Sequence, residues 1–406
     1  MKVLQINKYF YIKGGAETVF FNTMDLLTEK GHTVIPFSLK SRKNRPSAYE
    51  SYFVDYPELS ESGLWTKVKY LFAFIHNRQA ARKLKALLLA EKPDVAHIHL
   101  LFNCFSVSIL PVLKECKVPV VMSVHDYRLI CPAYTFIDGQ GHFCERCKAK
   151  HAYHCIVHRC YRNEWFSSIL LALDSYYRTW FIRPVELIDQ FIFVSRFSRD
   201  KHISMDASFE SKSLYLYNFT PLSDKGACLR SDYILFFGRI SAEKGIPTLM
   251  KAMEQIPDVK LKIVGTGPLL EDLKKHSGPN IEFAGFQSGN ELYDSIRKAR
   301  FVIVPSQCYE NNPLSVIESM TLGTPVIGSR IGGIPELIEE GRTGYIFDVK
   351  SAENLQQTIR KALSLPEQEY AAMSLAAKEF ASEQFSGESH YRRLMAVYDS
   401  VITKQG

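Results

Sequence analysis

Short apolar segments of strand length alternate with longer amphipathic segments along the whole chain, and the alternation runs through two rounds. Such alternation predicts parallel sheets, because two parallel neighbours need a crossover connection in place of a hairpin. The predicted fold is therefore α/β, with an open, doubly wound sheet in each half. Strands are expected at residues 2–7, 32–38, 94–98, 119–124 and 190–195, and again at 233–237, 260–264, 280–283, 301–304 and 325–328.

The two rounds are separated near residues 218–231, where turn-forming residues replace the periodic pattern. We predict an N-terminal domain over residues 1–215 and a C-terminal domain over residues 216–385. Helical periodicity continues over 366–403, and residues 386–406 are expected to pack back on the N-terminal domain. Two such domains would face each other across a cleft, and ligands of these sheets bind beyond the carboxyl ends of the strands.

Charge is distributed unevenly between the two halves. Residues 1–220 contain 29 Lys+Arg and 20 Asp+Glu, a balance of +9, whereas residues 221–406 contain 21 and 23, a balance of −2. An anionic partner of the first half is one interpretation, and ordinary solvated surface charge is the other. Hydrophobic residues make up 46% and charged residues 23%, which excludes a disordered or fibrous chain.

The expected location is cytoplasmic. The first ten residues lack the apolar core of a signal peptide. The sequence also contains no uninterrupted run of about 18 or more apolar residues, so no transmembrane helix is predicted. Residues 64–90 and 161–185 mix Lys and Arg with aromatic residues and Leu, a composition typical of helices that lie on anionic membrane surfaces. Core helices with solvated faces are the alternative. Nucleic acid is not an expected partner, because no nucleic-acid-binding motif is present.

Glycines follow three of the predicted strands. Gly14 and Gly15 open a helix after the first strand, Gly238 ends the first strand of the second half, and Gly265 and Gly267 follow the next one. Without a Cβ, glycine lets the backbone approach a ligand closely, and a helix N-terminus offers N–H groups to an anion. Plain tight turns use glycine in the same way, so these residues indicate a ligand only in combination with others.

Two cations and two carboxylates supply that combination. Arg239 and Lys244 follow a strand, and a guanidinium with an ammonium suits a diphosphate, although a surface ion pair with Glu243 is the alternative. Glu310 precedes a helix expected to begin near Pro313, and Glu318 lies inside that helix. Carboxylates accept hydrogen bonds from vicinal hydroxyls, so this pair suits a sugar and a ribose. The alternatives are that Glu310 is a favourable negative charge at the helix N-terminus and that Glu318 forms an ion pair with an arginine.

Together these motifs resemble the retaining glycosyltransferases of family four, the group 1 enzymes with two Rossmann-like domains facing across a cleft (GT-B). The specific elements are Arg239 with Lys244 and Glu310 with Glu318, and Gly332-Gly333-Ile334-Pro335-Glu336 adds to them. The resemblance covers nearly the whole chain and is densest over residues 233–348.

The resemblance implies roles for individual residues. Arg239 and Lys244 would bind the nucleotide diphosphate and offset charge on the leaving group, Glu310 would hold hydroxyls of the donor sugar, and His125 would face that sugar. Glu318 would hold the ribose, and Phe286 would lie against the base. The implied donor-binding residues are Gly14, Gly15, Gly238, Gly265, Gly267, Phe286, Asn311, Asn312, Pro313, Leu314 and Glu318.

The mechanism implied by the resemblance is front-face displacement, in which a phosphate oxygen of the leaving group helps to deprotonate the acceptor. Catalysis would then rest on positioning and charge stabilisation. No cofactor is expected for catalysis, because the family usually needs no divalent ion and no Asp-x-Asp motif is present. A structural residue is the alternative for His125.

Cys131, Cys144, Cys147 and Cys160 have the spacing C-x12-C-x2-C-x12-C within an insert at residues 131–160. Four thiolates at such spacing suit a structural zinc ion, and Cys155 is a substitute ligand. A reduced thiol cluster or a disulfide is the alternative. Metal analysis of the purified protein tests this prediction: the site requires about one zinc per chain, and finding none rejects it.

The predicted function is transfer of a sugar, with retained configuration, from a nucleotide diphosphate-sugar to a hydroxyl of a glycan or lipid-linked glycan in cell-surface polysaccharide synthesis. A polyprenyl-linked acceptor at an anionic membrane surface would account for the basic N-terminal half. A nucleotide-sugar epimerase and a non-catalytic nucleotide-sugar-binding protein are the alternatives. The base, the sugar and the linkage are not predicted.

Overall fold

The computed structural model describes residues 1–55, 73–102, 105–222 and 230–404. The chain forms two compact units: Met1–Leu216 with Tyr391–Gly406, and Tyr217–His390. Each unit contains a six-stranded sheet in which all neighbouring strands run parallel. This confirms the predicted α/β class with two doubly wound sheets.

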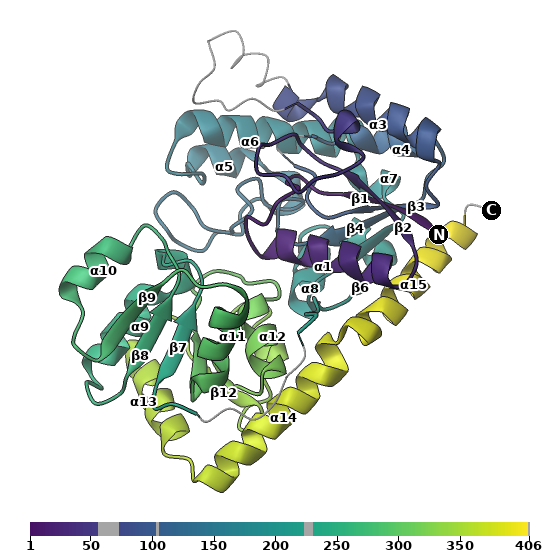
Figure 1. The fold of residues 1–406 in the computed structure, drawn as a ribbon. Coiled ribbons are helices and arrows are strands. Elements are labelled where there is room, and N and C mark those ends of the chain that lie inside the picture. The colour runs from purple at the N-terminus through teal and green to yellow at the C-terminus, as the bar shows by residue number, and fades with distance from the viewer. Residues whose placement is uncertain (56–72, 103–104, 223–229, 405–406) are drawn as a thin grey trace. The chain divides into compact units, whose positions relative to one another are not determined.

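In the first unit the strand order is β2-β1-β3-β4-β5-β6, with helices on the faces of the sheet (Figure 1). The strands are β1 (Lys2–Ile6), β2 (Thr33–Phe37), β3 (Val95–Ile98), β4 (Val120–Val124), β5 (Gln190–Phe193) and β6 (Ser213–Tyr215). The helices are α1 (Gly15–Glu29), η1 (Glu50–Tyr52), α3 (Arg78–Glu91), α4 (Ile109–Glu115), η2 (Lys148–Lys150), α5 (Tyr153–Val157), α6 (Trp165–Tyr177), the π-helical η3 (Arg178–Ile182), α7 (Pro184–Leu187), α8 (Arg196–Met205) and η4 (Ala207–Lys212). The C-terminal α15 (Gly387–Thr403) continues into this unit.

In the second unit the order is β12-β11-β10-β7-β8-β9. The strands are β7 (Ile234–Phe237), β8 (Leu261–Val264), β9 (Ile281–Gly285), β10 (Phe301–Val304), β11 (Val326–Ser329) and β12 (Gly344–Phe347). The helices are η5 (Ala242–Lys244), α9 (Ile246–Glu254), α10 (Leu270–His276), α11 (Gly289–Lys298), α12 (Leu314–Thr321), η6 (Pro335–Leu337), α13 (Ala352–Leu363) and α14 (Glu367–Phe385).

The ten predicted strands are all present, but β6 and β12 were not predicted. The strand β6 is only three residues long and half-buried, and β12 contains a glycine, so neither has a run of β-branched residues. The helical pattern over 366–403 corresponds to two helices, because Ser386 is extended and separates α14 from α15. Within the described residues, no helix is both long and apolar enough to span a bilayer.

Strand β1 shows why the strands are apolar on both faces. Leu4 and Ile6 pack into a core with the helix α3, whereas Val3 faces a second core that includes Leu394 and Val401 of α15. Both faces of a doubly wound sheet are covered, so alternate residues along a strand enter different cores.

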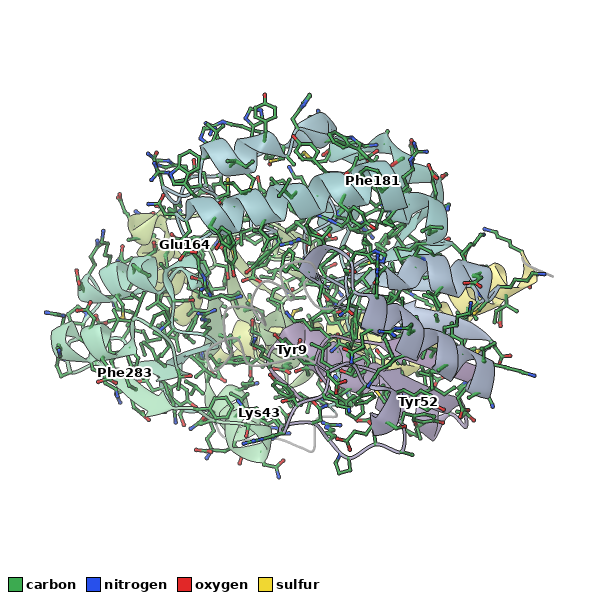
Figure 2. All side chains as sticks on the ribbon, turned by 90° about the horizontal axis from the view of Figure 1, so that it is seen from above. Tyr9, Lys43, Tyr52, Glu164, Phe181 and Phe283 are labelled. Carbon is green, nitrogen blue, oxygen red and sulfur yellow. The ribbon has the colours of Figure 1, made fainter. Side chains whose placement is uncertain are left out.

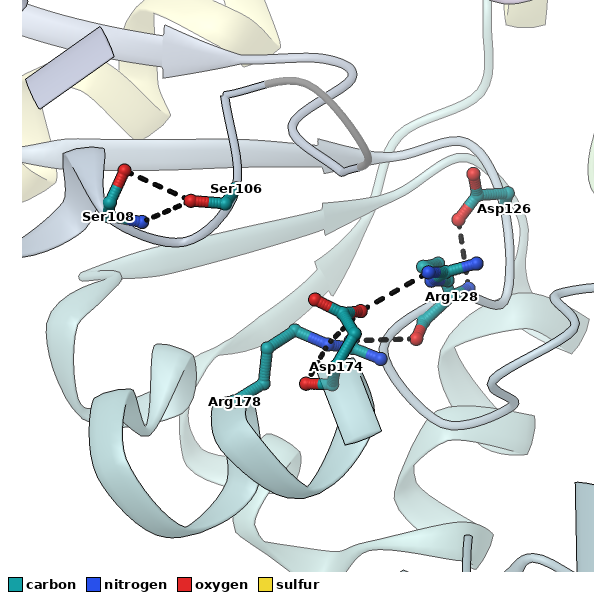
Figure 3. A network of polar contacts seen from close by, with 6 residues as sticks. All are labelled: Ser106, Ser108, Asp126, Arg128, Asp174 and Arg178. Atoms are coloured by element: carbon teal, nitrogen blue, oxygen red, sulfur yellow. Dashed lines mark hydrogen bonds and ion pairs between the residues drawn. The ribbon is translucent and has the colours of Figure 1, made fainter. Parts of the chain in front are cut away.

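A buried ion network lies beneath α6 (Figure 3). Asp174 Oδ2 lies 3.2 Å from a terminal nitrogen of Arg128 and 3.1 Å from Nε of Arg178. Arg178 also donates a 2.8 Å hydrogen bond to the backbone oxygen of Arg128. All three side chains are almost fully buried, and burial lowers the pKa of Arg178 to about 10. The adjacent loop is continuous with this network, because the N–H of Arg128 donates to the Asp126 carboxylate.

Asp174→Asn should lower the free energy of unfolding by about 3–5 kcal/mol, because it leaves two buried guanidinium groups without their counter-ion. Urea denaturation measures the loss. Glu186→Gln is the control, since Glu186 pairs with Arg183 on the exposed surface and such pairs contribute about 0–1 kcal/mol. Equal, small losses for the two variants would contradict a structural role for the network.

Candidate functional site

The strand order of the second unit places a topological switch point between β7 and β10. From β7 the chain proceeds through β8 and β9 in one direction, and from β10 through β11 and β12 in the other. The loops after β7 and β10 therefore diverge at the carboxyl edge, where doubly wound sheets bind their ligands. Arg239 and Lys244 follow β7, and Glu310 follows β10, so three predicted site residues share this edge.

Lys244 and Glu310 are in direct contact. Nζ of Lys244 lies 2.5 Å from Oε1 of Glu310, and the hydroxyl of Ser306 donates to the same oxygen at 2.7 Å. Burial opposes the charge on Lys244, but the attraction and hydrogen bond of Glu310 outweigh it, so the pKa of Lys244 lies above its ordinary value. At neutral pH this edge therefore holds a charged lysine beside a carboxylate.

The Gly332-Gly333 pair fixes the backbone of Glu310. The N–H of Gly333 donates to the Glu310 carbonyl at 2.7 Å. Gly332 has a φ of +60°, and a Cβ at this position would lie 2.4 Å from the same carbonyl oxygen. The glycines thus serve to bring the loop after β11 against the loop that carries Glu310, a packing role that the motif alone did not reveal.

The predicted glycines after β7 and β8 also pack on each other. A Cβ on Gly265, which has a φ of +140°, would lie 1.9 Å from the Gly238 carbonyl oxygen, and one on Gly267 would lie 2.1 Å from the Ile240 carbonyl oxygen. The N–H of Gly238 in turn donates to Val264 O at 3.0 Å. These contacts explain Gly265 and Gly267 by the close approach of two loops, and they bring the loop after β8 beside Arg239.

The loop before α12 carries the predicted residues Asn311, Asn312 and Pro313. The helix begins at Leu314, with Pro313 as its N-cap residue, so the first N–H groups of the helix have no acceptor within it. Asn311 lies half-buried in the preceding loop, and Asn312 is buried. The side-chain oxygen of Asn312 accepts the N–H of Asn218 at 2.8 Å, and its carbonyl accepts the Asn218 amide at 3.1 Å. Asn312 thus ties this loop to residue 218.

Glu318 lies in the second turn of α12 and is half-buried. Burial raises the pKa of Glu318 to about 7. Two further predicted residues point to solvent: Arg239 is exposed, and Phe286, directly after β9, has 72% of its surface exposed. An exposed ring and an exposed guanidinium are both available to a ligand.

The first unit has its own switch point, between β1 and β3. Gly14 precedes α1, which begins at Gly15, and both glycines are exposed. Glu17 in the first turn is buried, and burial raises its pKa. Sequence reasoning missed this carboxylate, whose signal was a Glu at the start of a glycine-led helix.

His125 follows β4 and belongs to a histidine network. Its Nε2 lies 3.1 Å from Nδ1 of His99, the two rings are stacked, and His99 also contacts Gln5 at 2.9 Å. Burial lowers the pKa of His125 to about 4, so the imidazole is neutral at physiological pH. A neutral imidazole can donate or accept a hydrogen bond but carries no charge. His99 was missed, although it stands at the carboxyl end of β3.

The four predicted zinc ligands are free thiols. Cys131, Cys144 and Cys155 are buried, and Cys147 and Cys160 are half-buried. Burial raises the pKa of Cys131 to about 11 and that of Cys147 to about 12, and the thiols interact with one another. Across the described parts of the chain, no group of three or more His, Cys, Asp or Glu side chains is arranged to hold a metal ion. The zinc site stays a prediction.

Solved structures with the same architecture cover the whole chain. Sucrose-phosphate synthase from Thermosynechococcus elongatus is 18% identical, with a TM-score of 0.71 over 99% of both chains. A glycosyltransferase from Rickettsia africae is 16% identical, with a TM-score of 0.69 over 99% of this chain and 98% of that one. Anabaena HepE in complex with UDP-glucose is 16% identical, with a TM-score of 0.65 over 98% and 100%. At these identities the likeness concerns the fold.

Relatives in sequence include a lipopolysaccharide 1,2-N-acetylglucosaminetransferase from Salmonella typhimurium, 32% identical over 39% of this chain. A D-inositol 3-phosphate glycosyltransferase from Mycobacteroides abscessus is 33% identical over 45% of the chain, and a sulfoquinovosyl transferase from Arabidopsis thaliana is 34% identical over 32%. The matches cover 46%, 44% and 26% of those proteins' own lengths.

Two family profiles match the chain. The profile described as Glycosyltransferase Family 4 matches residues 13–218, and the one described as Glycosyl transferases group 1 matches residues 224–380. Together they span both units. The chain therefore belongs to the family 4, group 1 glycosyltransferases and has their GT-B fold of two Rossmann-like domains.

Proposed function

We propose that the protein transfers a sugar, with retained anomeric configuration, from a nucleotide diphosphate-sugar to a hydroxyl of a glycan or lipid-linked glycan in cell-surface polysaccharide synthesis. The observation that carries the proposal is the contact between Lys244 and Glu310 at the switch point of the second unit. This contact supports the proposal because a lysine suits a diphosphate and a glutamate suits sugar hydroxyls, and the pair lies at the edge where such sheets bind ligands.

The site offers complementary groups for each part of the donor. Arg239 and Lys244 suit the diphosphate, and the first N–H groups of α12 add donors for a phosphate oxygen. Both polar contacts of the Glu310 carboxylate described above use Oε1, and its other oxygen can accept a sugar hydroxyl. Glu318 suits the ribose, and the exposed ring of Phe286 suits the base.

In the proposed reaction the bond between the anomeric carbon and the phosphate oxygen breaks, and the nucleoside diphosphate leaves with the electron pair. The acceptor oxygen bonds to the anomeric carbon on the same face, and its proton passes to a phosphate oxygen of the leaving group. Arg239 and Lys244 offset the charge that develops on the phosphate. A neutral imidazole such as that of His125 in the first unit suits a hydrogen bond to a sugar hydroxyl.

A screen of nucleotide-sugars tests the proposal and its alternatives. Thermal shift identifies the nucleotide that binds, because a ligand of the folded state raises the melting temperature. Proton NMR of the products then follows the sugar. Nucleoside diphosphate release with a retained anomeric configuration supports the proposal, whereas inversion overturns the retaining part. Sugar interconversion would identify an epimerase, for which Glu318 with a pKa of about 7 suits acid–base work. Binding without turnover would identify a non-catalytic protein.

Lys244→Ala should lower kcat/KM for the donor by about 100-fold or more, because it removes charge stabilisation of the leaving diphosphate. Steady-state kinetics with the identified donor measures the loss. The control is Lys274→Ala, which removes an exposed lysine paired with Glu271 on α10 of the same unit. Wild-type turnover by the Lys244 variant would overturn the assignment of the diphosphate site.

The affinity for the nucleoside diphosphate should rise as the pH increases through about 7, because ribose hydroxyls need the ionised form of Glu318. The pKa of Glu318 in the folded state exceeds the ordinary value of 4.5, so the same ionisation costs stability. Protonated Glu318 therefore contributes most to the stability of the folded state below pH 4.5, its ordinary pKa. This stability is lost as the pH rises from 4.5 to about 7.

Isothermal titration calorimetry at a series of pH values, with wild type and Glu318→Gln compared, measures the dependence. Titration of the ligand phosphate is common to both proteins and cancels in the comparison. Parallel pH profiles for the two proteins would show that Glu318 does not hold the nucleotide.

A further inference from the structure

The helix α6 and its π-helical continuation η3 expose a row of large apolar side chains. We call this row the outer stripe; its members are Trp165, Phe166, Ile169, Leu173, Trp180 and Phe181. Phe166 is 68%, Trp180 61% and Phe181 74% exposed. Figure 2 labels Phe181 and Glu164 towards opposite ends of this helical segment. The spacing of these residues, three, four and seven positions apart, is that of one helix face.

The helix α6 exposes large apolar side chains while part of its buried face is polar. It buries Leu171 and Ala172 together with Asp174, and η3 buries Arg178. Asp174 and Arg178 belong to the buried ion network shown in Figure 3. The helix α3 shows the ordinary arrangement, with Leu84, Leu87 and Leu88 buried and one large apolar residue, Leu89, exposed. The two basic-aromatic segments of the sequence, 64–90 and 161–185, thus differ. Residues 64–72 of the first lie outside the described residues, and its residues 78–90 belong to a helix that buries most of its leucines. In the second segment, α6 and η3 expose large apolar side chains.

The stripe is also concentrated. Fourteen large apolar side chains are exposed in the described parts of the chain, and eight of them lie on α5, α6 and η3. Tyr153 and Val157 of α5 are the other two, and α5 packs beside α6, with the N–H of Tyr153 bonded to the hydroxyl of Tyr176. Soluble proteins rarely expose contiguous apolar patches of this kind unless something binds them.

The charge around the stripe identifies the kind of partner. Residues 146–183 contain seven Lys+Arg and two Asp+Glu. Arg178 and Asp174 are both buried, which leaves six exposed cations and the exposed Glu164 in this range. Arg159 lies over the ring of Trp165 at 4.7 Å, Arg162 precedes the helix, and Arg183 follows Phe181. Exposed Glu186 beyond the range pairs with Arg183. Apolar and aromatic side chains framed by cations match an anionic lipid surface, with rings at the acyl boundary and cations on the headgroups.

We propose that the outer stripe docks the protein on the surface of an anionic lipid bilayer, with Trp165, Phe166, Trp180 and Phe181 inserted and Arg159, Arg162 and Arg183 on the headgroups. Two tryptophans within the stripe fit this position, because indole rings favour the boundary between headgroups and acyl chains. The inference does not depend on the sugar-transfer reaction.

Flotation with vesicles of phosphatidylcholine and phosphatidylglycerol in equal parts tests the proposal. The wild-type protein should float with these vesicles and bind less to vesicles of phosphatidylcholine alone. Trp180→Ser combined with Phe181→Ser should lower the partition coefficient by about tenfold or more, because each buried aromatic side chain contributes substantially to transfer. Arg159→Gln combined with Arg162→Gln should lower binding to the anionic vesicles and leave binding to phosphatidylcholine unchanged.

Leu89→Ser combined with Leu375→Ser is the matched control, because it removes two exposed apolar side chains elsewhere and should leave flotation unchanged. Thermal melting verifies that each variant is folded. Trp65→Phe leaves two tryptophans in the chain, both on the stripe, so their emission should shift to the blue on addition of anionic vesicles.

Three results would overturn the proposal. They are the absence of flotation by the wild type, equal flotation of the stripe variant and its control, or self-association through the stripe without vesicle binding. Sedimentation velocity of the wild type and the stripe variant detects the last outcome.

Discussion

The parallel pairing of every strand is the constraint on which the site depends. A parallel sheet brings the carboxyl ends of all its strands to one edge, and the crossover helices occupy its faces. Residues distant in the sequence therefore meet there, as the 2.5 Å contact between Lys244 and Glu310 shows. At the corresponding edge of the first unit, the histidine after β3 meets the histidine after β4. The strand order of each sheet thus determines which loops, and therefore which side chains, meet at its carboxyl edge.

The Asp174 network and the Lys244–Glu310 pair solve different electrostatic problems. Asp174 is buried with two arginines, and its removal would strand charge in a low dielectric, so the network specifies how α6 lies on the first unit. Lys244 and Glu310 form a pair at the carboxyl edge, where Lys244 remains about one third exposed. Because the pair is accessible, Lys244 can also contact a diphosphate and Glu310 can also accept a hydrogen bond from a sugar hydroxyl. The Asp174 network is suited to holding the fold together, and the Lys244–Glu310 pair is suited to binding a ligand.

Much of the fold was predictable because strand cores such as residues 301–304 are continuous runs of apolar residues, ended here by Pro305. The strands β6 and β12 were missed because β6 has only three residues, all half-buried, and β12 begins with a glycine, so both carry a weak apolar pattern. The candidate site was predictable as residues that follow strands, but the packing of Gly265 on Gly238 and of Gly332 on Glu310 was not. Those contacts depend on how closely two loops approach each other. The spacing of residues within one loop does not contain that information. Likewise, the pattern at residues 161–185 revealed an amphipathic helix without revealing which face is buried.

Hydrogen exchange followed by mass spectrometry, with and without the nucleoside diphosphate selected by thermal shift, tests the central claim most directly. The claim is that the donor binds at the β7–β10 switch point of the second unit. It predicts that the ligand slows exchange in peptides covering residues 238–245 and 308–318, where the backbone N–H groups of both loops would be held. If saturating ligand leaves the exchange rates of residues 238–245 and 308–318 unchanged, the claim is contradicted.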